Sequence, residues 1–275
     1  MIISVAIAIH NEEKNIIRCL SSIYNWIDEI VIVDGASTDH TIEVIKQFDV
    51  KHKIKIFHER HISMFHKNKQ KAIEQCTGQW IFQLDADEVV STELKNEIIS
   101  VLSTLSKHTS MTTTINQCET VAYSLPRLNH FLGQPLRKGG QYPDYTIRLY
   151  KNGSVRFPCK TVHEQVELIS KKEKNKILTH PLLHYPYPNF REYLRKWIQY
   201  SYFEADFLKQ HGLKPSLWNI KKYFFVLPFW WFFKTYIRHK GFQDGFAGLV
   251  FSLFSSIRFW VIYVALAEKK SAHLK

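Results

Sequence analysis

The sequence has 275 residues, of which 45% are hydrophobic and 23% are charged. This composition excludes global disorder, and the length suits one large domain, or one domain with an appendage. The formal net charge of +12 favours an anionic partner: a nucleotide, a phosphorylated substrate, nucleic acid or an anionic membrane face.

The four cysteines, Cys19, Cys76, Cys118 and Cys159, are widely spaced and form no Cys-x-x-Cys pair. This spacing favours buried free thiols in a reducing compartment over a disulfide framework. The N-terminal stretch "MIISVAIAIHNEE" has no basic segment and no small-residue cleavage site, so it predicts a first strand and not a signal peptide. We therefore expect the catalytic part to face the cytoplasm.

The N-terminal third alternates apolar runs with amphipathic segments. Four strands are predicted at "IISVAIAI", "EIVIVDGAS", "KIKIFHE" and "QWIFQLDADEVV", and helices at "NEEKNIIRCLSSIYNW", "STDHTIEVIKQF" and "NKQKAIEQCTG". Asn11 is the expected N-cap of the first helix, and Ser37 or Thr38 that of the second. This order predicts an α/β fold of parallel βαβ units, with the ligand beyond the carboxyl ends of the strands.

The middle of the chain predicts a mixture of elements. "STELKNEIISVLSTL" predicts a helix, and "SKHTSMTTTINQCET" predicts a surface loop because Ser, Thr and Asn dominate it. "VAYSLPRLNHFLG" and "YTIRLYKNGSVRF" predict strands, the second with a turn at Asn152-Gly153. "NFREYLRKWIQYSYFEADFLKQHG" predicts a long amphipathic helix that ends at Gly212.

The segment from Leu213 to Ala267 is rich in aromatic residues punctuated by Lys and Arg. Pro228 and Arg258 interrupt its apolar runs, which leaves neither at the roughly 20 residues that a spanning helix needs. Aromatic residues with flanking cations are typical of helices that lie in the membrane interface. A helical subdomain packed on the catalytic core, or an oligomer interface, is the alternative.

The stretch "FQLDADEVV" places three acids at the end of a predicted buried strand. In an extended segment Asp85 and Asp87 would point to the same side, where they could bind one Mg²⁺ or Mn²⁺ ion together with a diphosphate. Glu88 would point the other way, as a structural or helix-capping acid. The alternative for all three is a solvated turn after the strand.

Other polar residues also follow predicted strand ends. Asp34 could hydrogen-bond a base or a ribose, Lys69 could meet a phosphate, and the ring of His10 could stack on a base. A helix cap or a solvated charge is the ordinary explanation for each. Their coincidence at strand ends favours a nucleotide site.

Several stretches resemble known signatures. "SVAIAIHNEEKNIIRCLSSI", "EIVIVDGASTDHT" and "NKQKAIEQCTGQWIFQLDADE" resemble, in order, the signature blocks of family 2 glycosyltransferases with the GT-A fold. "GGQYPDYTIRLYKNG", "KTVHEQVE" and "PLLHYPY" resemble the branch of lipopolysaccharide-core β-glucosyltransferases. The resemblance implies a Rossmann-like, mainly parallel central sheet flanked by helices, with a helical, aromatic-rich C-terminal extension. The catalytic domain would cover about 1–190, with a nucleotide half at about 1–105 and an acceptor half at about 120–190, followed by the helical region 191–275.

The family also implies roles for single residues. Ala8 and His10 would hold the nucleobase, Glu12 and Asp34 would contact base or ribose, and Lys69 would lie near the base or the diphosphate. Asp85 and Asp87 would form the D-x-D pair, with Asp87 as the more direct metal ligand. His163 is a further possible ligand, a diphosphate contact or a structural histidine, and Arg148 would neutralise phosphate, fix Asp144 or lie on a strand surface. The sequence departs from the family at His10, where tyrosine is frequent, and at Gly35, where many members have a second acid.

An inverting transfer needs a carboxylate beside the acceptor hydroxyl. In many relatives an acid in a loop after the D-x-D strand is that base, and the resemblance implies that Asp144 takes this role. Gly139-Gly140 would let its loop approach the sugar. Glu164 is the rival base, and an ordinary loop aspartate is the alternative for Asp144.

The sequence therefore predicts a metal-dependent inverting glycosyltransferase that moves a sugar from a nucleotide-sugar donor, a UDP-hexose in the first instance, to a glycan or lipid-linked acceptor of the cell envelope. We expect it in the cytoplasm, peripheral at the inner face of the plasma membrane, with no nucleic-acid partner because no DNA- or RNA-reading motif is present. The alternatives are a haloacid-dehalogenase-like phosphatase, although "DADEVV" lacks the Gly-Thr continuation, and a non-catalytic membrane-binding module.

Overall fold

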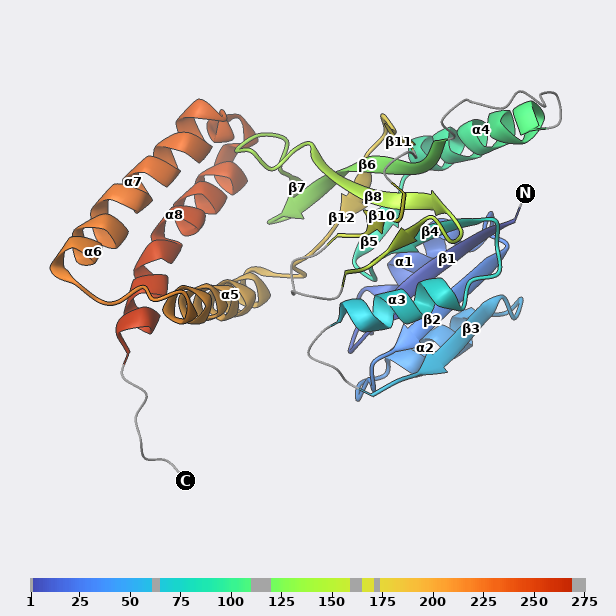
Figure 1. The fold of residues 1–275 in the computed structure, drawn as a ribbon, viewed down its shortest axis with the longest axis horizontal. Helices are drawn as coiled ribbons and strands as arrows, with labels where there is room; N and C mark the ends of the chain where they lie inside the picture. Colours follow the sequence, from blue (N-terminus) through green and yellow to red (C-terminus); the bar gives the residue numbers. More distant parts are fainter. Residues whose placement is uncertain (1, 61–64, 110–119, 159–164, 171–173, 269–275) are drawn as a thin grey trace. The chain divides into compact units, whose positions relative to one another are not determined.

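The computed structural model describes residues 2–60, 65–109, 120–158, 165–170 and 174–268, with the backbone alone at 106–109. The chain forms two compact units, shown in Figure 1. The first, here the sheet unit, is Met1–Arg127 with Asp144–His184, and the second, here the helical unit, is Leu128–Pro143 with Tyr185–Lys275. This division differs from the split expected near residue 190, because 128–143 groups with the C-terminal helices.

One mixed sheet organises the sheet unit, in the order β3-β2-β1-β4-β8-β6-β12-β5, with β11 beside β6. The strands are β1 (Ile3–Ile9), β2 (Glu29–Asp34), β3 (Ile54–His58), β4 (Trp80–Leu84), β5 (Glu88–Val90), β6 (Thr120–Phe131), β8 (Asp144–Lys151), β11 (Lys174–Ile177) and β12 (Leu182–His184). A separate pair is formed by β9 (Val155–Arg156) and β10 (Glu167–Leu168). The helices are α1 (Ile16–Ile23), α2 (Thr41–Phe48), α3 (His66–Glu74) and α4 (Thr92–Thr109).

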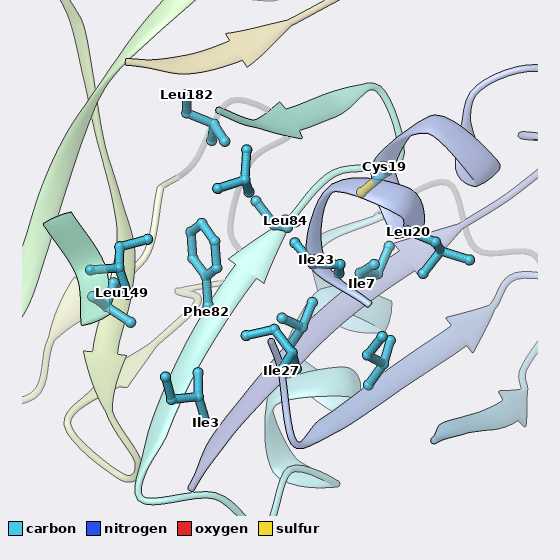
Figure 2. Packing of buried hydrophobic residues seen from close by; sticks show 14 of the residues in the cluster. Ile3, Ile7, Cys19, Leu20, Ile23, Ile27, Phe82, Leu84, Leu149 and Leu182 are labelled. Atoms are coloured by element: carbon cyan, nitrogen blue, oxygen red, sulfur yellow. The ribbon is translucent and has the colours of Figure 1, made fainter. Parts of the chain in front are cut away.

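The first half of the sheet is parallel, as the alternation of strands and helices predicts. β1 and β2 are buried along their whole length, and alternate residues enter cores on opposite faces of the sheet: Ile7 on one face, Ala6 on the other. Figure 2 shows Cys19, Leu20 and Ile23 of α1 packed with side chains of the first core. Coverage of both faces explains why these strands appear in the sequence as continuous apolar runs. The second half of the sheet is antiparallel where β4 meets β8 and where β8 meets β6.

The two expected helix caps are wrong. Helix α1 begins after Asn15, and Asn11 has a positive φ of 57° and accepts a hydrogen bond from Thr38 N instead. Helix α2 begins after His40, where the Asp39 carboxylate accepts a hydrogen bond from Thr41 N. The Asn11 side chain thus binds the neighbouring loop, and Asp39 takes the place expected for Ser37 or Thr38 at the start of α2, which local spacing does not reveal.

The D-x-D segment is a turn and not part of a strand. Strand β4 ends at Leu84 and β5 begins at Glu88, and Glu88 N donates a hydrogen bond to Asp85 O at 3.0 Å across the turn. The expectation that Asp85 and Asp87 share one side of an extended segment is therefore wrong. The turn and the side chains that contact each carboxylate determine where Asp85 and Asp87 point.

The helical unit consists of long helices. They are α5 (Phe190–Gln210), α6 (Leu217–Lys221), α7 (Leu227–Phe232) and α8 (Gly245–Ala267), with the π-helical turns η1 (Lys222–Val226) and η2 (Phe233–Arg238) and the 3₁₀ turn η3 (Gly241–Asp244). Asn189 caps α5 through Glu192 N, and Gly212 follows its end with a φ of 83°. The short strand β7 (Gln134–Pro135) pairs with the end of β6 in this unit.

The helix from Leu217 to Arg238 continues through Pro228. The expected break is absent there because the π-helical turn η1 precedes the proline, and its wider turn accommodates a residue that cannot donate to the turn before it. Arg258 likewise interrupts the apolar run of α8 without ending the helix. The stretch Gly241–Ala267 has 27 residues and contains an apolar window with a mean hydropathy of 1.9, which by length and composition is enough to cross a membrane, and 33% of that window is buried.

Candidate active site

The carboxyl ends of four strands form one edge of the sheet unit, because β3, β2, β1 and β4 are mutually parallel. His10 follows β1, Asp34 ends β2, His58 ends β3, and Asp85 follows β4. The polar residues singled out at strand ends in the sequence therefore gather along this edge. In sheets of this kind the edge is where ligands bind.

The proposed nucleobase residues are held in place by hydrogen bonds. His10 Nδ1 donates to the carbonyl oxygen of Gly35 at 2.9 Å, which fixes the ring orientation and its tautomer. The Asp34 carboxylate is 2% exposed and accepts from Ser37 N at 3.1 Å, with His58 Nδ1 at 3.3 Å. Asp34 thus stabilises the turn after β2.

Ala8 and Glu12, which the resemblance also assigns to nucleotide binding, differ in their surroundings. Ala8 is buried in β1, paired with Val33 of β2, so only its backbone is available to a ligand. The Glu12 carboxylate accepts a hydrogen bond from Asn15 Nδ2 at 2.9 Å, next to the start of α1.

Asp85 is bound by two cations. Lys69 Nζ of α3 lies 2.5 Å from Asp85 Oδ1, and the guanidinium of Arg148 in β8 lies 2.7 Å from Asp85 Oδ2. Burial opposes ionisation of Asp85, but the charges of Arg148 and Lys69 outweigh it and hold its pKa well below the usual range. Each carboxylate oxygen of Asp85 thus contacts one cationic side chain.

Arg148 is buried rather than exposed on a strand surface, with 5% of its surface accessible. It donates to Gln83, Asp85 and Glu88, the last at 2.6 Å. Glu88 is completely buried, and its other oxygen accepts a hydrogen bond from Asp85 N at 2.9 Å. Burial raises the pKa of Glu88 although Arg148 opposes that shift. Glu88 is therefore structural, as expected, and Arg148 acts on the site through Asp85.

Arg127 of β6 holds Asp144, and Arg148 does not. Arg127 donates to Asp144 Oδ2 from Nε at 3.0 Å and from its terminal nitrogen at 2.6 Å. Its guanidinium also lies 3.9 Å from Glu88. Arg127 was not singled out in the sequence, because it faces Asp144 only through the antiparallel register of β6 and β8.

These contacts form one series of alternating charges. The series, here the charge chain, runs Lys69, Asp85, Arg148, Glu88, Arg127, Asp144. It connects the D-x-D turn with the proposed base inside one unit.

Asp87 and His184 offer the best-matched donors for a metal ion. His184 Nε2 of β12 lies 3.4 Å from Asp87 Oδ2, and both side chains are partly accessible. A carboxylate and an imidazole suit Mn²⁺, and a diphosphate and water would complete its coordination. Within the described ranges no cluster of three or more His, Cys, Asp and Glu side chains suits a metal ion. His184 was not singled out in the sequence because its partner Asp87 lies far from it along the chain and meets it only through the pairing of β12 with β5.

Three further expectations concern other parts of the chain. His163 and Glu164 lie outside the described residues. Gly139 and Gly140 have φ values of 64° and 73°, and Gly139 N donates to His239 O at 2.9 Å within the helical unit. The observed role of these glycines is thus a left-handed backbone turn packed near His239. Cys19 and Cys76 are buried free thiols, as expected.

Several known proteins are similar to this chain in sequence or in structure over most of its length. The family model described as glycosyl transferase family 2 matches residues 4–162. An uncharacterized glycosyltransferase of Rickettsia bellii is 30% identical over 94% of this chain and 83% of its own. The lipopolysaccharide core biosynthesis glycosyltransferase LpsC of Rhizobium meliloti is 26% identical over 87% of this chain and 82% of its own. The crystal structure of S. aureus TarS is 14% identical over 96% of this chain and 55% of that chain, with a TM-score of 0.49.

The matched residues contain the parallel half of the sheet, the D-x-D turn and Asp144. The expected GT-A architecture, with an aromatic-rich helical C-terminal region, is confirmed, and so is the expected enzyme class. The chain belongs to glycosyltransferase family 2.

Proposed function

We propose that the protein is an inverting glycosyltransferase that transfers a hexose from a UDP-sugar to a hydroxyl of a glycan or lipid-linked acceptor in cell-envelope synthesis. The charge chain is the main support for this proposal. It connects the sheet edge at which a nucleotide would bind with Asp144, the carboxylate proposed to act as base. The similarity to LpsC, which is named for lipopolysaccharide core biosynthesis, supports an envelope acceptor.

The proposed step is a single displacement. The acceptor oxygen forms a bond to the anomeric carbon of the donor sugar while the bond from that carbon to the phosphate oxygen of UDP breaks. Asp144 takes the proton of the acceptor hydroxyl, and the electron pair leaves with UDP. Arg127 binds Asp144 Oδ2 and thereby orients the carboxylate so that its other oxygen can receive the proton. Glu164 stays the rival for this role.

On the donor side, His10 and the backbone near Ala8 would hold the base, with Glu12 and Asp34 next to the base or ribose. Lys69 would lie near the diphosphate. Asp87 and His184 would hold a divalent cation, Mg²⁺ or Mn²⁺, with Asp85 and His163 as further possible ligands. When bound, the cation would neutralise the charge on the diphosphate. Asp85 then acts mainly by orienting Lys69, and Arg148 by fixing Asp85.

The helical unit would place the enzyme on an anionic membrane. Exposed apolar side chains lie along α5, along the helix Leu217–Arg238 and along α8, and they include Phe207, Trp218, Phe225, Phe229, Phe233, Phe246, Trp260 and Val264. The sequence between Asp206 and Asp244 contains no acid but many lysines and arginines. Aromatic insertion and cation attraction together favour the inner face of the plasma membrane, with the catalytic part in the cytoplasm.

The test is a donor screen that measures hydrolysis and transfer with a panel of nucleotide sugars. UDP-hexoses should be used in preference to GDP-sugars, and Asp144→Asn should lower transfer by about 10²- to 10⁴-fold while UDP binding stays unchanged. Asp206→Asn, on the exposed side of α5, is the matched control. Turnover near the normal rate in Asp144→Asn would reject Asp144 as the base, and Glu164→Gln would be examined next.

A further inference from the structure

Two cations of the helical unit share one indole ring. Lys234 Nζ of η2 lies 4.7 Å from the ring centroid of Trp231, and Arg258 Cζ of α8 lies 5.1 Å from it. Each cation is attracted to the ring, but the two positive charges repel one another. An anion beside both would remove that repulsion.

Buried hydrogen-bond donors lie in the same cluster. Nε of Arg258 and Nε1 of Trp231 are both buried, and neither has an acceptor among the described residues. A buried N–H group without an acceptor destabilises the fold, so such groups are usually explained by a ligand, an ion or water. An anion with several oxygens would satisfy these donors together.

The chain supplies no acid nearby in sequence to act as that anion. No Asp or Glu occurs between Asp206 and Asp244, and none between Asp244 and Glu268. The ion pair observed on α5 joins Arg195 to Glu192 and involves neither Lys234 nor Arg258. The acceptor must therefore come from outside the helices that carry the cluster.

A π-helical turn lies beside the cluster of Trp231, Lys234 and Arg258. Trp231 lies near the end of α7, and Lys234 lies inside the π-helical turn η2, which follows directly. Lys234 lies over the indole three residues earlier in the chain, at the i, i+3 spacing of helical neighbours. Single π-helical turns occur frequently at functional sites.

A guanidinium and an ammonium side by side are typical of phosphate recognition. The planar guanidinium of Arg258 can bind two phosphate oxygens at once, and Lys234 adds a point charge. The neighbouring side chains Phe229, Trp230 and Phe233 are exposed and apolar. A phosphate attached to acyl or isoprenoid chains would match both the cations and these aromatic side chains.

We propose that Trp231, Lys234 and Arg258 form a binding site for the phosphate group of a lipid. The site rests on the membrane contact of the proposed function and adds selectivity for the head group to it. A phosphate of a membrane phospholipid and that of a lipid-linked acceptor present the same oxygens to these residues.

The test compares binding of the full-length protein to vesicles of neutral lipid, of neutral lipid with a phosphate-bearing anionic lipid, and of neutral lipid with a carboxylate-bearing anionic lipid at equal surface charge. The wild type should bind the phosphate vesicles about tenfold more tightly than the carboxylate vesicles. Arg258→Lys and Lys234→Arg keep the charge but change the geometry, so they should abolish this preference. Lys222→Arg, exposed on the same continuous helix, should retain it.

The outcomes separate this proposal from the function it rests on. Equal binding to both anionic vesicles, or an unchanged preference in Arg258→Lys, would overturn the phosphate site and leave membrane contact intact. No binding to any vesicle by the wild type would reject the membrane contact itself. Binding of inorganic phosphate alone, seen as a fluorescence change that Trp231→Phe removes, would assign the cluster to free phosphate and overturn the lipid assignment. The helical circular-dichroism signal of each variant, compared with that of the wild type, verifies that the helical unit is folded.

Discussion

Glu88 and Arg148 show how single buried charges hold the D-x-D turn. Both side chains are buried, and Arg148 links Glu88 to Asp85 at 2.6 and 2.7 Å. Charges taken out of water are tolerated only when they are paired and hydrogen-bonded. Burial of Asp85 and Glu88 would be unfavourable if they were unpaired. Their ion pairs with Arg148 therefore stabilise the turn.

Arg148→Met should destabilise the sheet unit by about 3–5 kcal/mol, because the buried Glu88 loses the guanidinium at 2.6 Å and keeps only the weaker contact with Arg127 at 3.9 Å among the described ion pairs. Adding Glu88→Gln to that variant should recover about 1–2 kcal/mol, since the amide can still accept the hydrogen bond from Asp85 N. Urea unfolding of the two single variants and the double variant measures both values. Strictly additive losses would show that the two side chains are not coupled.

Glu29 gives a pH-dependent contribution to stability. Burial opposes its ionisation, but hydrogen bonds from Lys55, Ser4 and Thr77 outweigh burial and lower its pKa to about 2. A pKa lowered by folding adds stability above the unfolded value, near 4.3, and this stability disappears as the pH falls toward 2. Glu29→Gln should therefore cost about 2 kcal/mol at pH 7.

The loss in Glu29→Gln should be the same at pH 5.5 as at pH 7 and should shrink as the pH falls below about 4.3. Denaturant unfolding of wild type and variant across this range measures the difference. A loss that is constant with pH would mean that packing, and not the charge of Glu29, is responsible.

At the scale of elements, the helix Leu217–Arg238 presents one continuous apolar face. Phe225, Phe229, Phe233 and Ile237 follow one another at intervals of four residues and are exposed. An α-helix with 3.6 residues per turn would rotate such a series around its axis, whereas the wider turns η1 and η2 counteract that rotation. The π-helical turns therefore keep these side chains along one face.

Replacing Phe229 with Ser should weaken binding to anionic vesicles by about tenfold, because it removes an exposed aromatic side chain from that face. Val50→Ser, an equally exposed apolar residue in the sheet unit, should have no effect. Vesicle sedimentation measures both. A change in the oligomeric state of Phe229→Ser with unchanged vesicle binding would assign the face to a protein interface instead.

At the scale of the whole molecule, a ligand that binds to one unit stabilises that unit directly and the other unit only indirectly. The two units have separate cores, so unfolding need not be a single transition. UDP with Mn²⁺ at about 100 times its dissociation constant should stabilise the sheet unit by about 2.7 kcal/mol and raise its melting temperature.

Asp87→Ala should remove the metal-dependent part of this stabilisation and leave the apo melting temperature nearly unchanged. His184→Ala should reduce the same part, while Asp206→Asn should not. Differential scanning calorimetry with and without each ligand measures these shifts. A full metal-dependent shift in Asp87→Ala would exclude Asp87 as a ligand.

The local elements were predictable from the sequence to a large extent. β1 and β2 appear as apolar runs because both of their faces are covered, and α5 is bounded by Asn189 and Gly212 as expected. The positions of Asp34 and Asp85 at one sheet edge followed from the parallel order alone. The predicted caps failed, because Asn11 and Ser37 bind across two loops that are distant in the sequence.

The sequence by itself determined the α/β alternation, the aromatic C-terminal helices and the signatures of the glycosyltransferase family. These are properties of local composition and spacing. Only the tertiary structure decided which charges meet: Arg127 with Asp144, Arg148 with Asp85 and Glu88, and His184 with Asp87. Such pairs depend on the register of non-adjacent strands, and a shift of one residue would turn each side chain to the opposite face of the sheet.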